Sequence, residues 1–93
     1  ITQVNFETKA TTASKKKKLI SMIEQHPEGV AIYSKYGGKA HAVLLTDYTD
    51  GVFYVVDPVY GKKVTMAEST LYSKSATQTS RLAALHSYWY IKH

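Results

Sequence analysis

Two apolar runs joined by a short turn constrain the fold of this chain more than any other feature. Residues 39–48 and 52–57 are rich in strand-forming residues, and Thr49, Asp50 and Gly51 separate them. This pattern predicts a β-hairpin, because glycine fills the left-handed position of a three-residue loop without steric cost. Both faces of the hairpin are apolar, so we expect a sheet that is covered on both sides.

Each strand of the hairpin carries one ionisable residue far from the turn, His41 on the first strand and Asp57 on the second. With a three-residue loop, Asp57 lies opposite Val43, two positions from His41 on the same face. Diagonal neighbours on one face are roughly 7–8 Å apart, within reach of an imidazole and a carboxylate. A two-residue or four-residue loop would put the pair on opposite faces, so the hypothesis depends on loop parity.

A histidine oriented by a carboxylate is typical of nucleophilic catalytic sites. The chain has no cysteine, which excludes disulfides, zinc–thiolate sites and a cysteine nucleophile on this chain. Two simpler interpretations stay open. His41 could be an ordinary buried histidine, and Asp57, which precedes Pro58, could merely cap a turn.

The rest of the chain predicts shorter elements within one small α+β domain over residues 1–93, an antiparallel sheet with an N-terminal helix packed on it. The helix is expected over residues 12–26, capped by Thr12 or Ser14, because an apolar stripe ends before Pro27. The other expected segments are an extended arm over 1–11, strands over 30–33, 62–65 and 87–91, a short helix over 66–72, a loop over 73–81, and helix or strand over 82–85.

Charge and histidine spacing narrow the possible partners. The net charge is +5, and the four lysines at 15–18 form one run. We favour a solvated first helical turn for this run and keep an anionic-surface partner as the alternative. Arg81 is the only arginine, and we expect no nucleic acid as a partner.

The sequence also predicts neither a membrane span nor a metal site. No apolar run approaches the roughly 20 residues of a membrane span. His26, His86 and His93 lack helical ligand spacing and are expected at the surface or in tails, so no catalytic metal or other cofactor is expected.

Three segments carry a resemblance to a known family. Residues 26–32, 38–44 and 54–58, followed by Gly61, resemble the C-terminal half of papain-like cysteine peptidases. The likeness is closest to the bacterial branch related to the peptidases that cleave double-glycine leaders from bacteriocins, and it covers about residues 14–65. The resemblance implies that His41 is the general base for a cysteine thiol and that Asp57 orients the imidazole.

The resemblance also implies that part of the catalytic site is elsewhere. In the family, a cysteine opens a helix in the N-terminal half and a glutamine precedes it, and neither has a counterpart here. We therefore expect the C-terminal part of a larger hydrolase, inactive alone, with the cysteine on a missing or separate N-terminal segment or second chain. A start at Ile1 fits a processed product. A peptide or protein substrate and a bacterial extracellular or cell-surface location are expected. The alternative is a non-catalytic peptide-binding module of the same fold.

Overall fold

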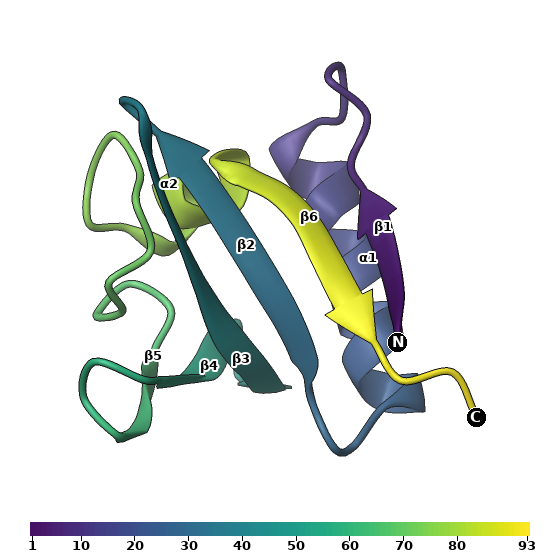
Figure 1. Ribbon diagram of the computed structural model, residues 1–93. Coiled ribbons are helices and arrows are strands. Elements are labelled where there is room, and N and C mark those ends of the chain that lie inside the picture. The colour runs from purple at the N-terminus through teal and green to yellow at the C-terminus, as the bar shows by residue number, and fades with distance from the viewer.

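The structure, a computed structural model, describes residues 1–93 and has an α+β fold (Figure 1). Six strands form one antiparallel sheet in the order β1-β6-β2-β3-β4-β5. The predicted α+β class is confirmed. The elements are β1 (Thr2–Asn5), α1 (Thr12–Gln25), β2 (Val30–Tyr36), β3 (Lys39–Thr49), β4 (Val52–Asp57), β5 (Lys62–Thr65), α2 (Gln78–Ala83) and β6 (Leu85–Tyr90).

Helix α1 forms where the sequence predicts it and packs behind the sheet in the view of Figure 1. Its N-cap is Thr11, whose side chain accepts a hydrogen bond from the Ser14 N–H, so the cap lies one residue before the predicted positions. Leu19 and Met22 are its buried apolar residues and face the sheet core. The core also contains Val30, Ile32, Val43, Leu45, Phe53, Val55, Met66, Leu71, Leu82, Leu85 and Tyr88.

The sheet is covered on one face only, so the expectation of cover on both sides is wrong for this chain. Both helices lie on the same side of the sheet (Figure 1). Along β4, Phe53 and Val55 are fully buried against that side, whereas Tyr54 and Val56 on the other face are half-buried. Both faces of the hairpin strands are apolar, but no helix of this chain packs on the second face (Figure 1).

The hairpin has the predicted strand pairing near His41 and Asp57, but its turn differs from the predicted turn. Thr49 pairs with Val52 across a two-residue turn, in which Asp50 (φ 51°) and Gly51 (φ 82°) both adopt left-handed backbone. The predicted three-residue loop is therefore wrong. A β-bulge between Leu45 and Asp47 shifts the register by one residue, however, and restores the predicted pairing beyond it. Asp57 consequently points to the same face as His41.

Three further segments differ from their predictions. The N-terminal arm contains β1, an edge strand that pairs with β6. Residues 66–68 form a turn and residues 69–72 are irregular, so the predicted helix is wrong, although Thr65 and Glu68 exchange the hydrogen bonds of a capping box. Residues 73–81 are only partly loop, because α2 begins within them after its N-cap Thr77. A single buried residue in α2, Leu82, explains why the apolar pattern gave no sign of this helix.

The four lysines at 15–18 do not form one solvated turn. Lys15 is buried, and its Nζ donates hydrogen bonds to the carbonyl oxygens of Ala83 and Leu85 at 2.9 and 2.8 Å. Burial lowers the pKa of this ammonium group. The favoured solvated interpretation is wrong for Lys15, which fastens α1 to the start of β6, while Lys17 and Lys18 are exposed.

Candidate functional site

The Asp57 side chain is a fully buried carboxylate at the end of β4. Its Oδ2 atom accepts hydrogen bonds from the Thr70 N–H at 2.6 Å and the Thr70 hydroxyl at 2.8 Å. Its Oδ1 atom accepts one from the Val59 N–H at 3.0 Å, since the chain turns sharply after Pro58. Burial alone would raise the pKa of Asp57, but the hydrogen bonds from Thr70, Val59 and His41 outweigh it and hold the pKa below its ordinary value.

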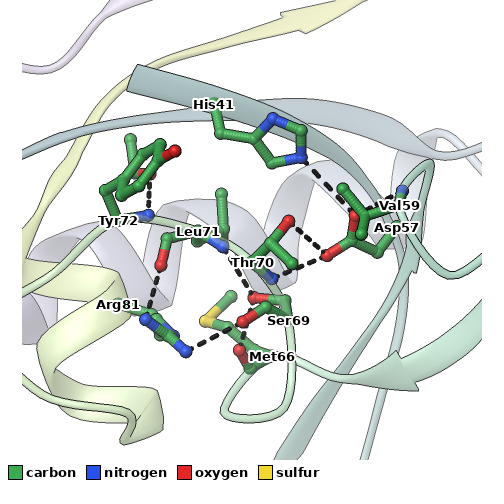
Figure 2. A network of polar contacts seen from close by, with 10 residues as sticks. His41, Asp57, Val59, Met66, Ser69, Thr70, Leu71, Tyr72 and Arg81 are labelled. Carbon is green, nitrogen blue, oxygen red and sulfur yellow. Dashed lines mark hydrogen bonds and ion pairs between the residues drawn. The ribbon is translucent and has the colours of Figure 1, made fainter. Parts of the chain in front are cut away.

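His41 on β3 faces this carboxylate (Figure 2). Its Nε2 atom lies 3.5 Å from Asp57 Oδ1, and its side chain is 27% exposed. This distance is at the long end for a hydrogen bond. Contacts of this kind are often long in free enzymes and shorten when substrate binds. The Nδ1 atom makes no hydrogen bond within the chain, so one ring nitrogen faces a buried carboxylate and the other is free for an external group.

The structure thus brings together the two residues that the sequence singled out. A third, Thr70, was missed, because it lies in the segment predicted as helix and gives no signal of its own in the sequence. It is placed by the loop over residues 66–73, which crosses below His41 in Figure 2. Without the two Thr70 donors, the buried Asp57 carboxylate would keep only the Val59 N–H and the long His41 contact.

Arg81 on α2 clamps this loop (Figure 2). Its guanidinium donates hydrogen bonds to four acceptors that alternate along the loop: the carbonyl oxygens of Ala67, Ser69 and Leu71 and the hydroxyl of Ser73. The planar fork of arginine suits such multiple bonding. Arg81 therefore acts on Asp57 through Thr70. That it is the only arginine in the chain is the one sequence signal that could have pointed to it.

A second anchor holds the far end of the loop. The fully buried hydroxyl of Ser34 on β2 accepts a hydrogen bond from the Tyr72 N–H at 2.9 Å. Ser34 is also the direct β-ladder partner of His41. The strand that positions the imidazole and the loop that positions the carboxylate are therefore tied to the same residue.

The chemistry that this arrangement permits is proton transfer at His41 Nδ1, with Nε2 of the same ring facing the Asp57 carboxylate. The chain supplies no cysteine for the imidazole to activate. Neither helix has the length and apolar character needed to cross a bilayer. Comparisons of the chain with models of known families, with curated proteins and with solved structures found no match.

Proposed function

We propose that this chain is the base-supplying part of a papain-like cysteine peptidase, a hydrolase that acts on peptide or protein substrates. The nucleophilic cysteine is supplied by a separate N-terminal segment or a second chain. The observation that carries the proposal is the contact between His41 Nε2 and Asp57 Oδ1, in which a fully buried carboxylate faces a partly exposed imidazole. The resemblance in the three sequence segments supports the same assignment.

Energetics favour this assignment over an inert pair. A buried carboxylate is costly unless it is hydrogen-bonded, and here three N–H and O–H donors from the loop and turn hold Asp57 ionised. A buried histidine without a catalytic role would need only one neutral hydrogen-bond acceptor for its ring N–H, and not a buried carboxylate. A preformed anion beside the imidazole instead favours its cationic form, which is the form that a general base adopts after it has taken a proton.

The proposed reaction has two stages. His41 Nδ1 takes the proton of the cysteine thiol, and the thiolate attacks the scissile carbonyl carbon to form a C–S bond. The imidazolium then gives its proton to the departing amine as the C–N bond breaks. In the second stage, His41 takes a proton from water as the water oxygen attacks the thioester carbonyl carbon. The C–S bond then breaks to release the acid, and the imidazolium returns its proton to the departing thiolate, which regenerates the thiol. Asp57 holds the ring and stabilises the imidazolium in both stages.

The complete protein encoded by the reading frame tests this proposal. We expect it to contain an upstream cysteine and to hydrolyse peptides, with His41→Ala lowering kcat/KM by about 10²- to 10⁴-fold, the usual worth of a general base. Asp57→Asn should lower it less, because the base remains but loses its orientation. His86→Ala, which alters a histidine outside the pair, is the matched control. Full activity of His41→Ala, or a reading frame without cysteine, would contradict the proposal.

The second candidate is a non-catalytic peptide-binding module of the same fold, and the absence of cysteine from all 93 residues favours it. Such a module would bind peptides without cleaving them. Its affinity would also survive His41→Ala, because no proton transfer is involved. Titration of peptides into the complete protein encoded by the reading frame and into its His41→Ala variant, followed by mass analysis of the peptides, distinguishes the two candidates.

A further inference from the structure

Three metal-ligating side chains meet at the end of β2 that lies away from His41. His26 is the C-cap of α1, Glu28 lies in the turn that leads to β2, and His93 follows β6. Figure 1 shows the C-terminal tail beside this turn. His26 Nδ1 lies 3.2 Å from Glu28 Oε2, and His93 Nε2 lies 3.1 Å from the same oxygen. All three ligand atoms are within 4.8 Å of one another.

The two separations that involve Glu28 fit the edges of a metal coordination sphere. Zinc binds imidazole nitrogen at about 2.0–2.1 Å and carboxylate oxygen at about 2.0–2.2 Å, so neighbouring ligand atoms of a tetrahedral site are about 3.4 Å apart. The two contacts to Glu28 differ from that edge by only a few tenths of an ångström. Two imidazoles that compete for one carboxylate oxygen can both be satisfied by a divalent cation placed between the three atoms.

The donor set is partly preorganised by packing. The expected surface position is wrong for His26, which is buried and whose ring packs on Tyr90 with 4.9 Å between the ring centroids. The rings of His26 and His93 stack at 5.8 Å with an interplanar angle of 23°. His93 is largely exposed, at 66% of its side chain, which gives an ion access from solvent. Packing thus holds the His26 ring in place, whereas the more exposed Glu28 and His93 side chains can move to bind the ion.

We propose that His26, Glu28 and His93 form a binding site for a divalent transition metal of the zinc class, with water in the remaining coordination position. Imidazole and carboxylate ligands suit Zn²⁺ and Ni²⁺, whereas Mg²⁺ and Ca²⁺ prefer all-oxygen sites. The bound ion fastens the tail after β6 to the turn between α1 and β2. The site lies at the opposite end of β2 from Ser34, the ladder partner of His41, and is structural instead of catalytic.

Zn²⁺ alone, titrated into the ¹⁵N-labelled chain at constant pH, tests the site. We expect one ion per chain, shifts of the His26 and His93 ring signals, and a rise of several degrees in Tm when the ion is in large excess over its Kd. His93→Gln and Glu28→Gln should each weaken Zn²⁺ binding by about 10-fold or more, the scale of loss seen even for outer-sphere partners of metal ligands. His93 is exposed, so His93→Gln leaves the fold intact.

The matched controls use the other histidines and another ion. His86→Gln should bind Zn²⁺ as the wild type does, and Mg²⁺ should leave the histidine signals unchanged. Unaltered affinity in His93→Gln, or Zn²⁺-induced shifts at the rings of His41 or His86 in place of His26 and His93, would overturn the proposal. Because the readouts are binding and Tm, the result is independent of peptidase activity.

Discussion

The description of the site depends on Asp57 being ionised in the folded chain. Stability at acid pH tests this. The pKa of Asp57 in the folded chain is held below the value of about 3.9 expected for an unfolded chain. The folded chain therefore binds this proton less readily, and the resulting stability is present above the unfolded pKa. It is lost as the pH falls through the lower, folded pKa.

Asp57→Asn should remove this acid-dependent component. Between about pH 5 and pH 2, we expect the free energy of unfolding to fall more steeply for the wild type than for Asp57→Asn. Urea unfolding at a series of pH values measures both slopes. Glu28, Asp47 and Glu68 also have lowered pKa values, but they are present in both proteins and cancel in the comparison. Equal slopes would show that Asp57 is not held ionised by its neighbours.

Thr70 supplies the hydroxyl that the carboxylate needs. Thr70→Val keeps the shape of the side chain and the backbone N–H donor but removes a hydrogen bond to a charged acceptor. We expect a loss of about 1.5–3 kcal/mol in the free energy of unfolding. Thr70→Ser restores the hydroxyl and should recover most of that loss in the same urea experiment. A serine variant as unstable as the valine variant would assign the effect to the methyl group instead.

At the scale of elements, the loop over residues 66–73 takes its shape from the Arg81 clamp. Arg81→Met removes four hydrogen bonds from a charged donor and should cost at least about 3 kcal/mol, since single bonds of this kind contribute about 1.5–3 kcal/mol. Arg81→Lys should recover little, because an ammonium group cannot span the same fork. Lys74→Met, at an exposed position nearby, should stay within about 0.5 kcal/mol of the wild type.

The clamp also predicts a local consequence. In Arg81→Lys, the amide signal of Thr70 and the ring signals of His41 should shift together, because the loop carries Thr70 to Asp57 and Asp57 contacts His41. Heteronuclear NMR spectra of the folded variant measure these shifts. Shifts confined to the four acceptor residues would mean that the loop keeps its place without the guanidinium.

The hairpin shows how far local sequence rules reach. Two apolar runs and the turn residues Thr49, Asp50 and Gly51 predicted the hairpin itself, and the predicted juxtaposition of His41 with Asp57 is what the structure has. The loop length was wrong by one residue, and the bulge at Thr46 offset the error. No residue in 39–57 predicts that bulge, because Thr46 is of a type that is common in regular strands. Asp57 therefore shares a face with His41 because the two-residue turn and the bulge offset each other. Only the turn has a signal in the sequence.

Long-range contacts explain what could not be predicted. Thr70 reaches Asp57 because of a loop whose form is set by an arginine on a later helix, and Lys15 is buried by carbonyl groups nearly seventy positions along the chain. Capping-box residues such as Thr65 and Glu68 predicted a helix that tertiary contacts override. Propensity and periodicity describe neighbours in sequence, so they identified five of the six strands and α1 but neither β1 nor the polar network that completes the site.

At the scale of the whole molecule, the two faces of the sheet should respond differently to the same substitution. Val55 is fully buried beneath the helices, whereas its neighbour Val56 points to the open face. Val55→Thr places a hydroxyl in the core and should cost about 1–3 kcal/mol. Val56→Thr should change stability by about 0.5 kcal/mol or less. Equal losses in thermal or urea unfolding would mean that the second face is covered in solution.

The ring tautomer of His41 tests the central claim most directly, and the chain as it stands is sufficient. If the Asp57 carboxylate orients the imidazole, neutral His41 carries its proton on Nε2 and leaves Nδ1 unprotonated, ready to accept a proton. Long-range ¹H–¹⁵N spectra, recorded at a pH where the ring is neutral, report which nitrogen is protonated. The account predicts the Nε2–H form in the wild type and a mixture of tautomers in Asp57→Asn. A ring protonated on Nδ1, or one indifferent to Asp57→Asn, would contradict it.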